Sequence, residues 1–483
     1  MSDSSASSTS FAPVASTERL YALDTLRGVA LLGILLMNIL TFAFPMATYF
    51  NPNVAGGNSG PNWAIWFVQY VFWDGKMRAI FSLMFGVGLL LLTERASKRG
   101  ADAGIADVYL RRILWLLLFG IIHAFLVWEG DILYPYALIG LALYPFRKLS
   151  PKALLIIAGI QIALLTGASI AGGFEAKEKK QKYEEAAALK KQGKTLTDDQ
   201  KAALESWESQ LRYIAPTPEQ LKKEIDAHKA GYVELFKWRV KEVSQWHGMP
   251  YYSPAMWDMM AMMFIGMALY KTGVLATQRS WRFYGWMAAI GFLLGVPLNA
   301  VSTWLTWKVA FDPVQTNWTM ASYQLGRVAM ALAYVAVLQL ILKAGALAWL
   351  TARLAAVGQM AFSNYISHSL ICSTLFYGYG FGLYQRMERY QVYGVVAAIW
   401  TFQLLMSPVW LRHFHFGPLE WCWRSLTYWK RQPFRIRPEV AVTEPAAPQE
   451  VLVVDALTPA REAAPEGEQP NREPRAAEAA AAD

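Results

Sequence analysis

Cysteine and histidine, which build most disulfide and metal sites, are scarce in this chain. Only 2 cysteines and 6 histidines occur among its 483 residues. Cys372 lies in an apolar stretch and Cys422 lies beyond the last such stretch, so we expect neither a disulfide framework nor a cysteine-based metal site. The sequence also lacks a Walker-type loop and an HExxH motif, which argues against an ATPase and a zinc peptidase. We therefore predict no metal cofactor.

Charged residues are sparse as well: they make up 17% of the chain, whereas hydrophobic residues make up 55%. Apolar stretches of the roughly 20 residues that cross a bilayer recur along nearly the whole sequence. This pattern predicts an all-α polytopic integral membrane protein whose main partner is the lipid bilayer. About ten transmembrane helices are expected, at residues 22–43, 76–94, 110–128, 132–147, 153–173, 254–272, 282–306, 322–343, 355–377 and 391–411.

The stretch 62–94 is too long for one upright helix. We expect an interfacial piece rich in tryptophan, followed by a span that begins after Asp74 and Gly75. Lys76 and Arg78 stand at the start of this span, where their long side chains can extend to the membrane interface.

Lysine and arginine are concentrated in alternate loops, which predicts the orientation of the spans. The segment 44–62 contains neither residue, whereas the tail after the last span is basic from Arg412 onward. Basic loops stay in the cytoplasm, so both termini are expected there. The net charge of +9 is explained by these loops and requires no nucleic acid partner. The basic loop residues are Arg95, Lys98, Arg99, Arg111, Arg112, Arg147, Lys148, Lys152, Lys271, Arg279 and Arg282.

A polar insertion divides the apolar stretches into two groups of five. The predicted segments are a disordered N-terminus at 1–18, a first membrane bundle at 19–173, a helical insertion at 174–250, a second bundle at 251–430 and a disordered tail at 431–483.

The insertion is rich in helix-forming residues. Two breaks divide it into about three helices, and Thr197 and Thr217 begin sequences that resemble capping boxes. Long loops cross a membrane regardless of charge, so we expect the insertion outside the cytoplasm. It is either a cap over an external mouth or a solvated spacer.

Polar side chains inside the first span mark a candidate site. Asp24 and Arg27 are three residues apart and share a helix face with Asn38. Ionisable groups in membrane spans usually face a bundle interior or a wet cavity. Asp24 and Arg27 are therefore expected to be each other's partner. The alternative is that the pair only stabilises the helix end.

His123 is a candidate general base in the third predicted span. Imidazole titrates near neutral pH and can accept or release a proton. Asp131 follows it closely enough to orient the ring. The alternative is a hydrogen-bonded histidine with only a packing role.

Two further pairs of polar residues have four-residue spacing within predicted spans. Asn364 and His368 share one face and either line a site or join helices. Arg327, four residues after Tyr323, needs an anion, which is either a protein carboxylate or a ligand phosphate. By depth, the residues that could share one cavity are Asn38, His123, Arg327, Asn364 and His368.

The run LDTLRGVALLGILLMN at 23–38 resembles the opening signature of the YeiB-type family of bacterial membrane proteins, named for domain of unknown function 418. The chain is identified as a member of that family, although the insertion has no matching motif. Further blocks that resemble family motifs are Lys76 to Gly88, Arg111 to Gly140, Gly358 to Ser369 and Phe416 to Thr427.

That family is similar to the transmembrane acyltransferases, which include the lysosomal heparan-α-glucosaminide N-acetyltransferase. The resemblance implies transfer of an acyl group across the membrane, with acetyl-CoA or another acyl-CoA as donor. The lysosomal enzymes are thought to use a histidine in the first luminal loop, but 44–62 contains none. His123 is the substitute base if the activity is retained.

The leading hypothesis is an acyltransferase of the bacterial inner membrane. It would move an acyl group from cytosolic acyl-CoA to a hydroxyl or amine of an acceptor from the envelope or periplasm, a glycan or small molecule. His123 would deprotonate the acceptor and Asp131 would hold His123. The oxyanion would be stabilised by Asn38, Asn364 or Arg327, with His368 in the same candidate site.

The donor would bind at the cytoplasmic end of the spans. Arg27, Arg111 and Arg112 lie there and could bind the phosphates of an acyl-CoA. Asp24, the expected partner of Arg27, belongs to the same candidate site.

Two other functions fit the same residues. A small-molecule transporter or exporter would use the polar residues as a pathway without covalent chemistry, and a non-catalytic scaffold would use the insertion to dock a partner. The oligomeric state is left open, a homo-oligomer included.

Overall fold

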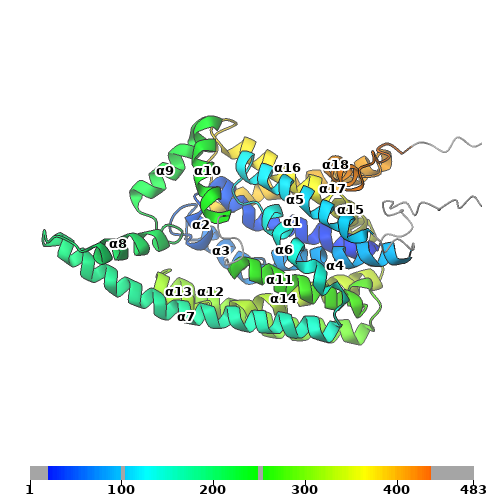
Figure 1. Cartoon of the computed structure of the whole chain (residues 1–483), viewed down its shortest axis with the longest axis horizontal. Coiled ribbons are helices and arrows are strands. Elements are labelled where there is room, and N and C mark those ends of the chain that lie inside the picture. The colour runs from blue at the N-terminus through cyan, green and yellow to red at the C-terminus, as the bar shows by residue number, and fades with distance from the viewer. Residues whose placement is uncertain (1–19, 99–103, 248–253, 437–483) are drawn as a thin grey trace, which may run out of the picture. The chain divides into compact units, whose positions relative to one another are not determined.

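The computed structural model describes residues 20–98, 104–247 and 254–436 (Figure 1). The predicted disordered N-terminus and the tail beyond residue 436 lie outside these ranges. Within them the chain is helical, and the only β pairing is an isolated bridge between Phe414 and Arg435. The all-α fold class predicted from the sequence is confirmed.

Every predicted span overlaps one or two helices. These are α1 (Tyr21–Ala43), α4 (Lys76–Lys98), α5 (Ile105–Leu126), α6 (Leu133–Leu143) with the 3-10 turn Tyr144–Lys148, α7 (Pro151–Lys191), α11 (Pro254–Lys271), α12 (Trp281–Lys308), α14 (Tyr323–Lys343), α15 (Ala348–Gln359), α16 (Ala361–Phe376) and α17 (Arg389–His413). The shorter helices are α2 (Ala47–Phe50), α3 (Pro61–Phe72), α8 (Asp198–Leu211), α9 (Pro218–Lys229), α10 (Tyr232–His247), α13 (Pro313–Thr319) and α18 (Pro418–Tyr428).

Six helical segments of the described chain are long and apolar enough to cross a membrane. They are Tyr21–Ala43, Pro61–Lys98, Pro151–Lys191, Trp281–Lys308, Tyr323–Lys343 and Arg389–His413. The number ten and the cytoplasmic termini remain predictions.

Two breaks within apolar stretches shape the bundle. The predicted break in 62–94 is present, because α3 ends at Phe72 and α4 begins at Lys76 with Gly75 between them at φ +69°. The predicted span 355–377, in contrast, is two helices, α15 and α16. Their junction is stabilised by Glu420 of α18, whose carboxylate accepts the backbone N–H groups of Phe362 and Ser363 at 2.6 and 3.0 Å.

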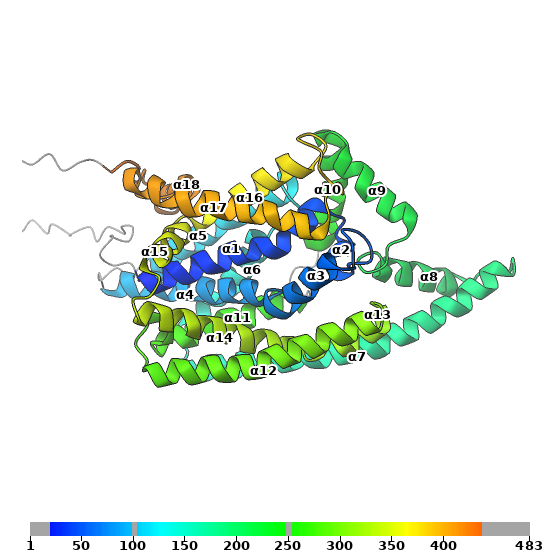
Figure 2. The same ribbon diagram turned by 180° about the vertical axis from the view of Figure 1, so that it is seen from behind.

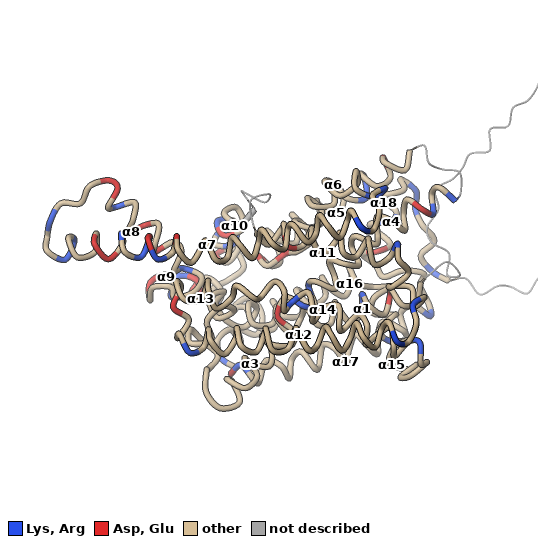
Figure 3. Tube along the Cα trace, turned by 90° about the horizontal axis from the view of Figure 1, so that it is seen from below, with Lys and Arg blue, Asp and Glu red and all other residues tan. Residues whose placement is uncertain are grey.

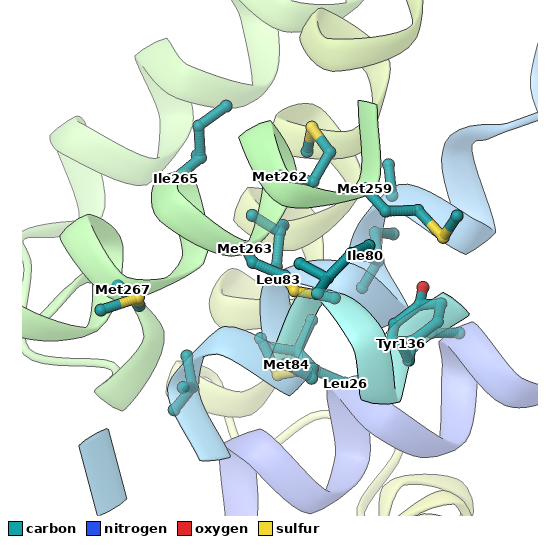
Figure 4. Packing of buried hydrophobic residues seen from close by; sticks show 14 of the residues in the cluster. Leu26, Ile80, Leu83, Met84, Tyr136, Met259, Met262, Met263, Ile265 and Met267 are labelled. Atoms are coloured by element: carbon teal, nitrogen blue, oxygen red, sulfur yellow. The ribbon is translucent and has the colours of Figure 1, made fainter. Parts of the chain in front are cut away.

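The core is formed by helices from both halves of the sequence. α1 runs through the middle of the bundle (Figure 1) and packs against α4, α15, α16 and α17. Methionines of α11 meet Ile80, Leu83 and Met84 of α4 (Figure 4). The two predicted membrane bundles therefore lie within one unit.

Glycines allow the central helices to approach closely. A Cβ on Gly28 would lie 2.0 Å from the carbonyl oxygen of Leu354, and one on Gly358 would lie 1.9 Å from that of Asp24. A Cβ on Gly86 would lie 2.3 Å from the carbonyl oxygen of Met263. Small residues are the usual means by which membrane helices bring their backbones into contact.

The insertion gathers at one end of the bundle, which we call the insertion end. α7 continues for 41 residues, through the fifth predicted span and into the insertion. α8, α9 and α10 lie at the same end as α2 and α3 (Figure 2). The predicted capping boxes at Thr197 and Thr217 are present at the starts of α8 and α9.

The opposite end, which we call the basic end, carries lysine and arginine near α4, α15 and α18 (Figure 3). There residues 431–436, which the sequence places in the disordered tail, fold back on the end of α17. His415 N–H donates to Phe434 O and Ile436 N–H to His413 O, both at 2.9 Å.

A buried ionic contact holds the insertion to the bundle. Glu129, in the turn after α5, lies 3.1 Å from Arg239 Nε of α10 and 3.3 Å from His228 Nε2 of α9. Burial alone would raise the pKa of Glu129, but the hydrogen bond from His228 and the charge of Arg239 outweigh it and hold the pKa at about 2.

We expect Gly86→Ala to lower the free energy of unfolding by about 1–3 kcal/mol, because the new methyl group would overlap the α11 backbone. Gly88→Ala on the same helix is the matched control, since a Cβ there meets nothing within 4 Å. Thermal unfolding in detergent measures the unfolding midpoint of each variant. Equal midpoints for the two variants would contradict the close contact of α4 and α11.

We expect Glu129→Gln to destabilise the protein by about 3–5 kcal/mol near neutral pH, because Arg239 loses its buried counter-charge. The folded-state pKa of Glu129 lies below the usual unfolded value, about 4.3. The stability that ionised Glu129 contributes is therefore fully present above the unfolded-state pKa, and it is lost as the pH falls toward the folded-state pKa of about 2. The difference in unfolding midpoint between wild type and Glu129→Gln should narrow over this interval. Glu178→Gln, in an exposed ion pair with Lys182, should have little effect at any pH.

Candidate functional site

The clearest polar constellation begins at the end of α5. His123 lies in the last turn of that helix, and its Nδ1 is 2.7 Å from Asp131 Oδ1 in the following turn. The other carboxylate oxygen of Asp131 accepts the backbone N–H of Tyr134 at 2.7 Å. Both side chains are buried, with 2% and 0% exposure. Asp131 thus links the ring of His123 to the start of α6.

A third residue, Ser369 of α16, completes the constellation. Its Oγ lies 2.9 Å from His123 Nε2, and it is 1% exposed. When Nδ1–H of His123 donates to the Asp131 carboxylate, Nε2 is left to accept the Ser369 hydroxyl proton. Sequence analysis did not single out Ser369, because no local spacing pairs residues 246 positions apart.

A cavity of about 290 Å³ leads from the basic end toward this constellation. Its wall is largely apolar, with Leu23, Phe81 and Met84 among its residues. Arg27 and Arg112 line it toward the basic end, and Tyr136 and Tyr365 line it toward the middle of the bundle. A single space therefore joins cationic side chains to the interior.

Tyr365 separates the cavity from His123. Its ring centroid is 5.3 Å from that of His123, and its hydroxyl accepts the Ile132 N–H at 3.2 Å. His123, Asp131 and Ser369 do not themselves line the cavity. The three residues lie one aromatic side chain beyond its inner end.

The residues predicted to bind a donor lie mainly at the basic end of the cavity. Arg27 forms a 2.8 Å ion pair with Asp24, its expected partner, and both line the cavity. The guanidinium of Arg112 stacks on Trp423 at 3.8 Å from the ring centroid. Arg111, its neighbour on α5, does not line the cavity.

The polar residues of α16 that the sequence did single out face another helix. Asn364 Nδ2 donates to Ser407 Oγ of α17 at 3.0 Å, and His368 Nε2 lies 2.8 Å from Gln403 Oε1. These contacts favour the helix-joining alternative. Asn38 is half-buried, and its carbonyl accepts the Thr41 hydroxyl at 3.0 Å. The residues expected to share one cavity are thus distributed over separate environments.

Arg327 belongs to a second buried cluster, nearer the insertion end. Its guanidinium donates to Asp258 of α11, which also pairs with Arg78 at 3.1 Å. The anion that Arg327 requires is therefore a protein carboxylate. Lys76 is fully buried and donates to Tyr70 O at 2.7 Å, so it does not extend to the interface. Asp258, an acid within an apolar stretch, was a signal that sequence analysis missed.

Comparison with known proteins finds relatives of unassigned function. Residues 269–430 match the family described as "Protein of unknown function (DUF418)". The chain is 29% identical to the uncharacterized protein YxaH of Bacillus subtilis, over 89% of this chain and 100% of that protein. It is also 29% identical to the uncharacterized protein YeiB of Escherichia coli, over 85% and 96% of the two chains. No solved structure matches the chain.

Proposed function

We propose that this chain, which belongs to the YeiB-type DUF418 family, is an acyltransferase of the bacterial inner membrane. It takes an acyl group from cytosolic acyl-CoA and passes it to a hydroxyl or amine of an envelope glycan or small molecule. The observation that carries the proposal is the cavity that runs from arginines at the basic end toward a buried base, His123. The basic end faces the cytoplasm in this proposal, in line with the distribution of lysine and arginine.

The cavity has properties that suit an acyl-CoA. Guanidinium groups are good ligands of phosphate, and Arg27 and Arg112 line its basic end. The apolar wall of the cavity suits an acyl chain and the pantetheine arm of CoA, which carries that chain. A volume of about 290 Å³ is at the lower limit of ligand pockets. The thioester end therefore enters, while the nucleotide stays at the basic end.

His123 has the surroundings of a general base. Asp131 holds its Nδ1 side and stabilises the imidazolium that forms when Nε2 accepts a proton. Tyr365 lines the inner end of the cavity and uses its hydroxyl oxygen to accept the Ile132 N–H. Its own O–H proton remains available for a carbonyl oxygen that becomes negative during transfer.

The Asp258 cluster favours a second candidate, a transporter without covalent chemistry. Buried ion pairs within membrane helices often lie on substrate or ion pathways. The Arg78 side chain keeps 35% exposure although its partner Asp258 has only 3%. This function predicts no binding of acyl-CoA and no cleavage of its thioester.

The test is binding of acetyl-CoA and longer acyl-CoAs to the detergent-purified protein, measured by thermal shift. We expect wild type to be stabilised and Arg27→Ala to bind at least about tenfold more weakly, because one charge-assisted contact is lost. His123→Ala should bind the donor but release no CoA thiol when acceptor is supplied in a membrane extract.

Arg282→Ala is the matched control, because Arg282 is exposed at the start of α12 and does not line the cavity. It should bind acyl-CoA as wild type does. Failure of every acyl-CoA to stabilise a folded wild-type protein would reject acyl transfer and favour the transporter.

A further inference from the structure

We propose that Ser369 is acylated during the reaction, so that the acyl group passes from the donor thioester to Ser369 Oγ and from there to the acceptor. This inference rests on the proposed function and identifies its covalent intermediate. Ser369, His123 and Asp131 form a continuous chain, with distances of 2.9 and 2.7 Å between successive polar atoms. The order hydroxyl, imidazole, carboxylate is that of an activated serine nucleophile.

The hydrogen bonds of His123 indicate which group it deprotonates. Its Nδ1 is occupied by Asp131, and its Nε2 by Ser369. A base that acted directly on a bound acceptor would need Nε2 free to face that acceptor. In the described arrangement the hydroxyl within reach of Nε2 is that of Ser369.

Two neighbouring serines of α16, Ser367 and Ser373, differ from Ser369 in their hydrogen bonding. The hydroxyls of Ser367 and Ser373 donate to the carbonyl oxygens of Asn364 and Leu370 in their own helix. Such bonds to the preceding turn are the common way to satisfy a buried helical serine. The Ser369 hydroxyl instead pairs with a histidine on α5, which a purely helical packing role does not require.

The cavity ends at Tyr365, and Ser369 lies beyond it. Tyr365 lies one helical turn before Ser369 on the same helix and lines the cavity. A turn of the Tyr365 ring would open the inner end of the cavity to Ser369 Oγ. An ester formed at this depth would be shielded from water, which limits its hydrolysis.

The chemistry is balanced in two steps. In the first, the Ser369 O–H proton moves to His123 Nε2 as Oγ forms a bond to the acyl carbon. The carbon–sulfur bond of the thioester breaks, and the CoA thiolate takes the proton from Nε2. In the second, an acceptor hydroxyl or amine gives its proton to Nε2 and attacks the ester carbon, and Ser369 Oγ leaves and regains the proton.

Isotope exchange tests the intermediate without knowledge of the acceptor. Full-length protein in detergent is incubated with acetyl-CoA and radiolabelled free CoA, with no acceptor present. An acyl-serine intermediate returns its acetyl group to labelled CoA, so label should enter acetyl-CoA. We expect Ser369→Ala to reduce this exchange by roughly a thousandfold or more. Ser373→Ala, a buried serine of the same helix, should retain it.

Mass spectrometry and donor binding complete the test. Acid-quenched wild-type protein should carry one acetyl group on the peptide that contains Ser369, and Ser369→Cys should carry it as a thioester that hydroxylamine cleaves. Ser369→Ala that still binds acetyl-CoA by thermal shift is folded, so its loss of exchange supports the proposal.

Two results would overturn the proposal. Wild-type protein that binds acetyl-CoA and acylates an acceptor but shows no exchange would mean direct transfer, with Ser369 only orienting His123. Absence of any acyl-CoA binding would overturn the intermediate together with the proposed function.

Discussion

The bond between Glu420 and the start of α16 is the interaction on which the candidate site depends. The first N–H groups of a helix have no partner within the helix, and they are costly to bury unsatisfied. Here they point into the bundle, and the Glu420 carboxylate accepts two of them and the Ser363 hydroxyl as well. This fixes where α16 begins. Tyr365 and Ser369 follow about one and two turns later and so reach the cavity and His123.

Burial of charge takes two forms in this protein. Glu129 pairs with one arginine and Asp258 with two, and these contacts join distant parts of the chain. Asp131 differs because its partner, His123, has a second nitrogen that contacts a hydroxyl. An arginine–carboxylate pair cannot relay a proton, because the guanidinium does not release its own in proteins. The second kind can move a proton, which is why the chemistry is proposed at Asp131 and not at the larger clusters.

Much of the fold could be predicted because its causes are local. Apolar length located the helices, and the caps at Thr197 and Thr217 followed from four-residue patterns. The contacts between Asp24 and Arg27 and between His123 and Asp131 were predictable because each pair is close in sequence.

The remaining contacts depend on which helices become neighbours. Ser369 meets His123, Asp258 meets Arg327, and Glu420 divides an apolar stretch that reads as one span. For the same reason the spacing of Asn364 and His368 could not reveal that both face α17.

The length of α7 has a mechanical consequence. A helix of 41 residues is about 60 Å long, roughly twice the hydrocarbon thickness of a bilayer. Its first half carries apolar side chains such as Ile160 and Leu164, which are 55% and 67% exposed and suit contact with lipid. Its second half carries lysine and glutamate and continues without a break to Lys191, before the turn that leads to α8 at Asp198. Because α7 is one continuous helix, a change in tilt of its lipid-facing half would move its far end, within the insertion, through the larger arc.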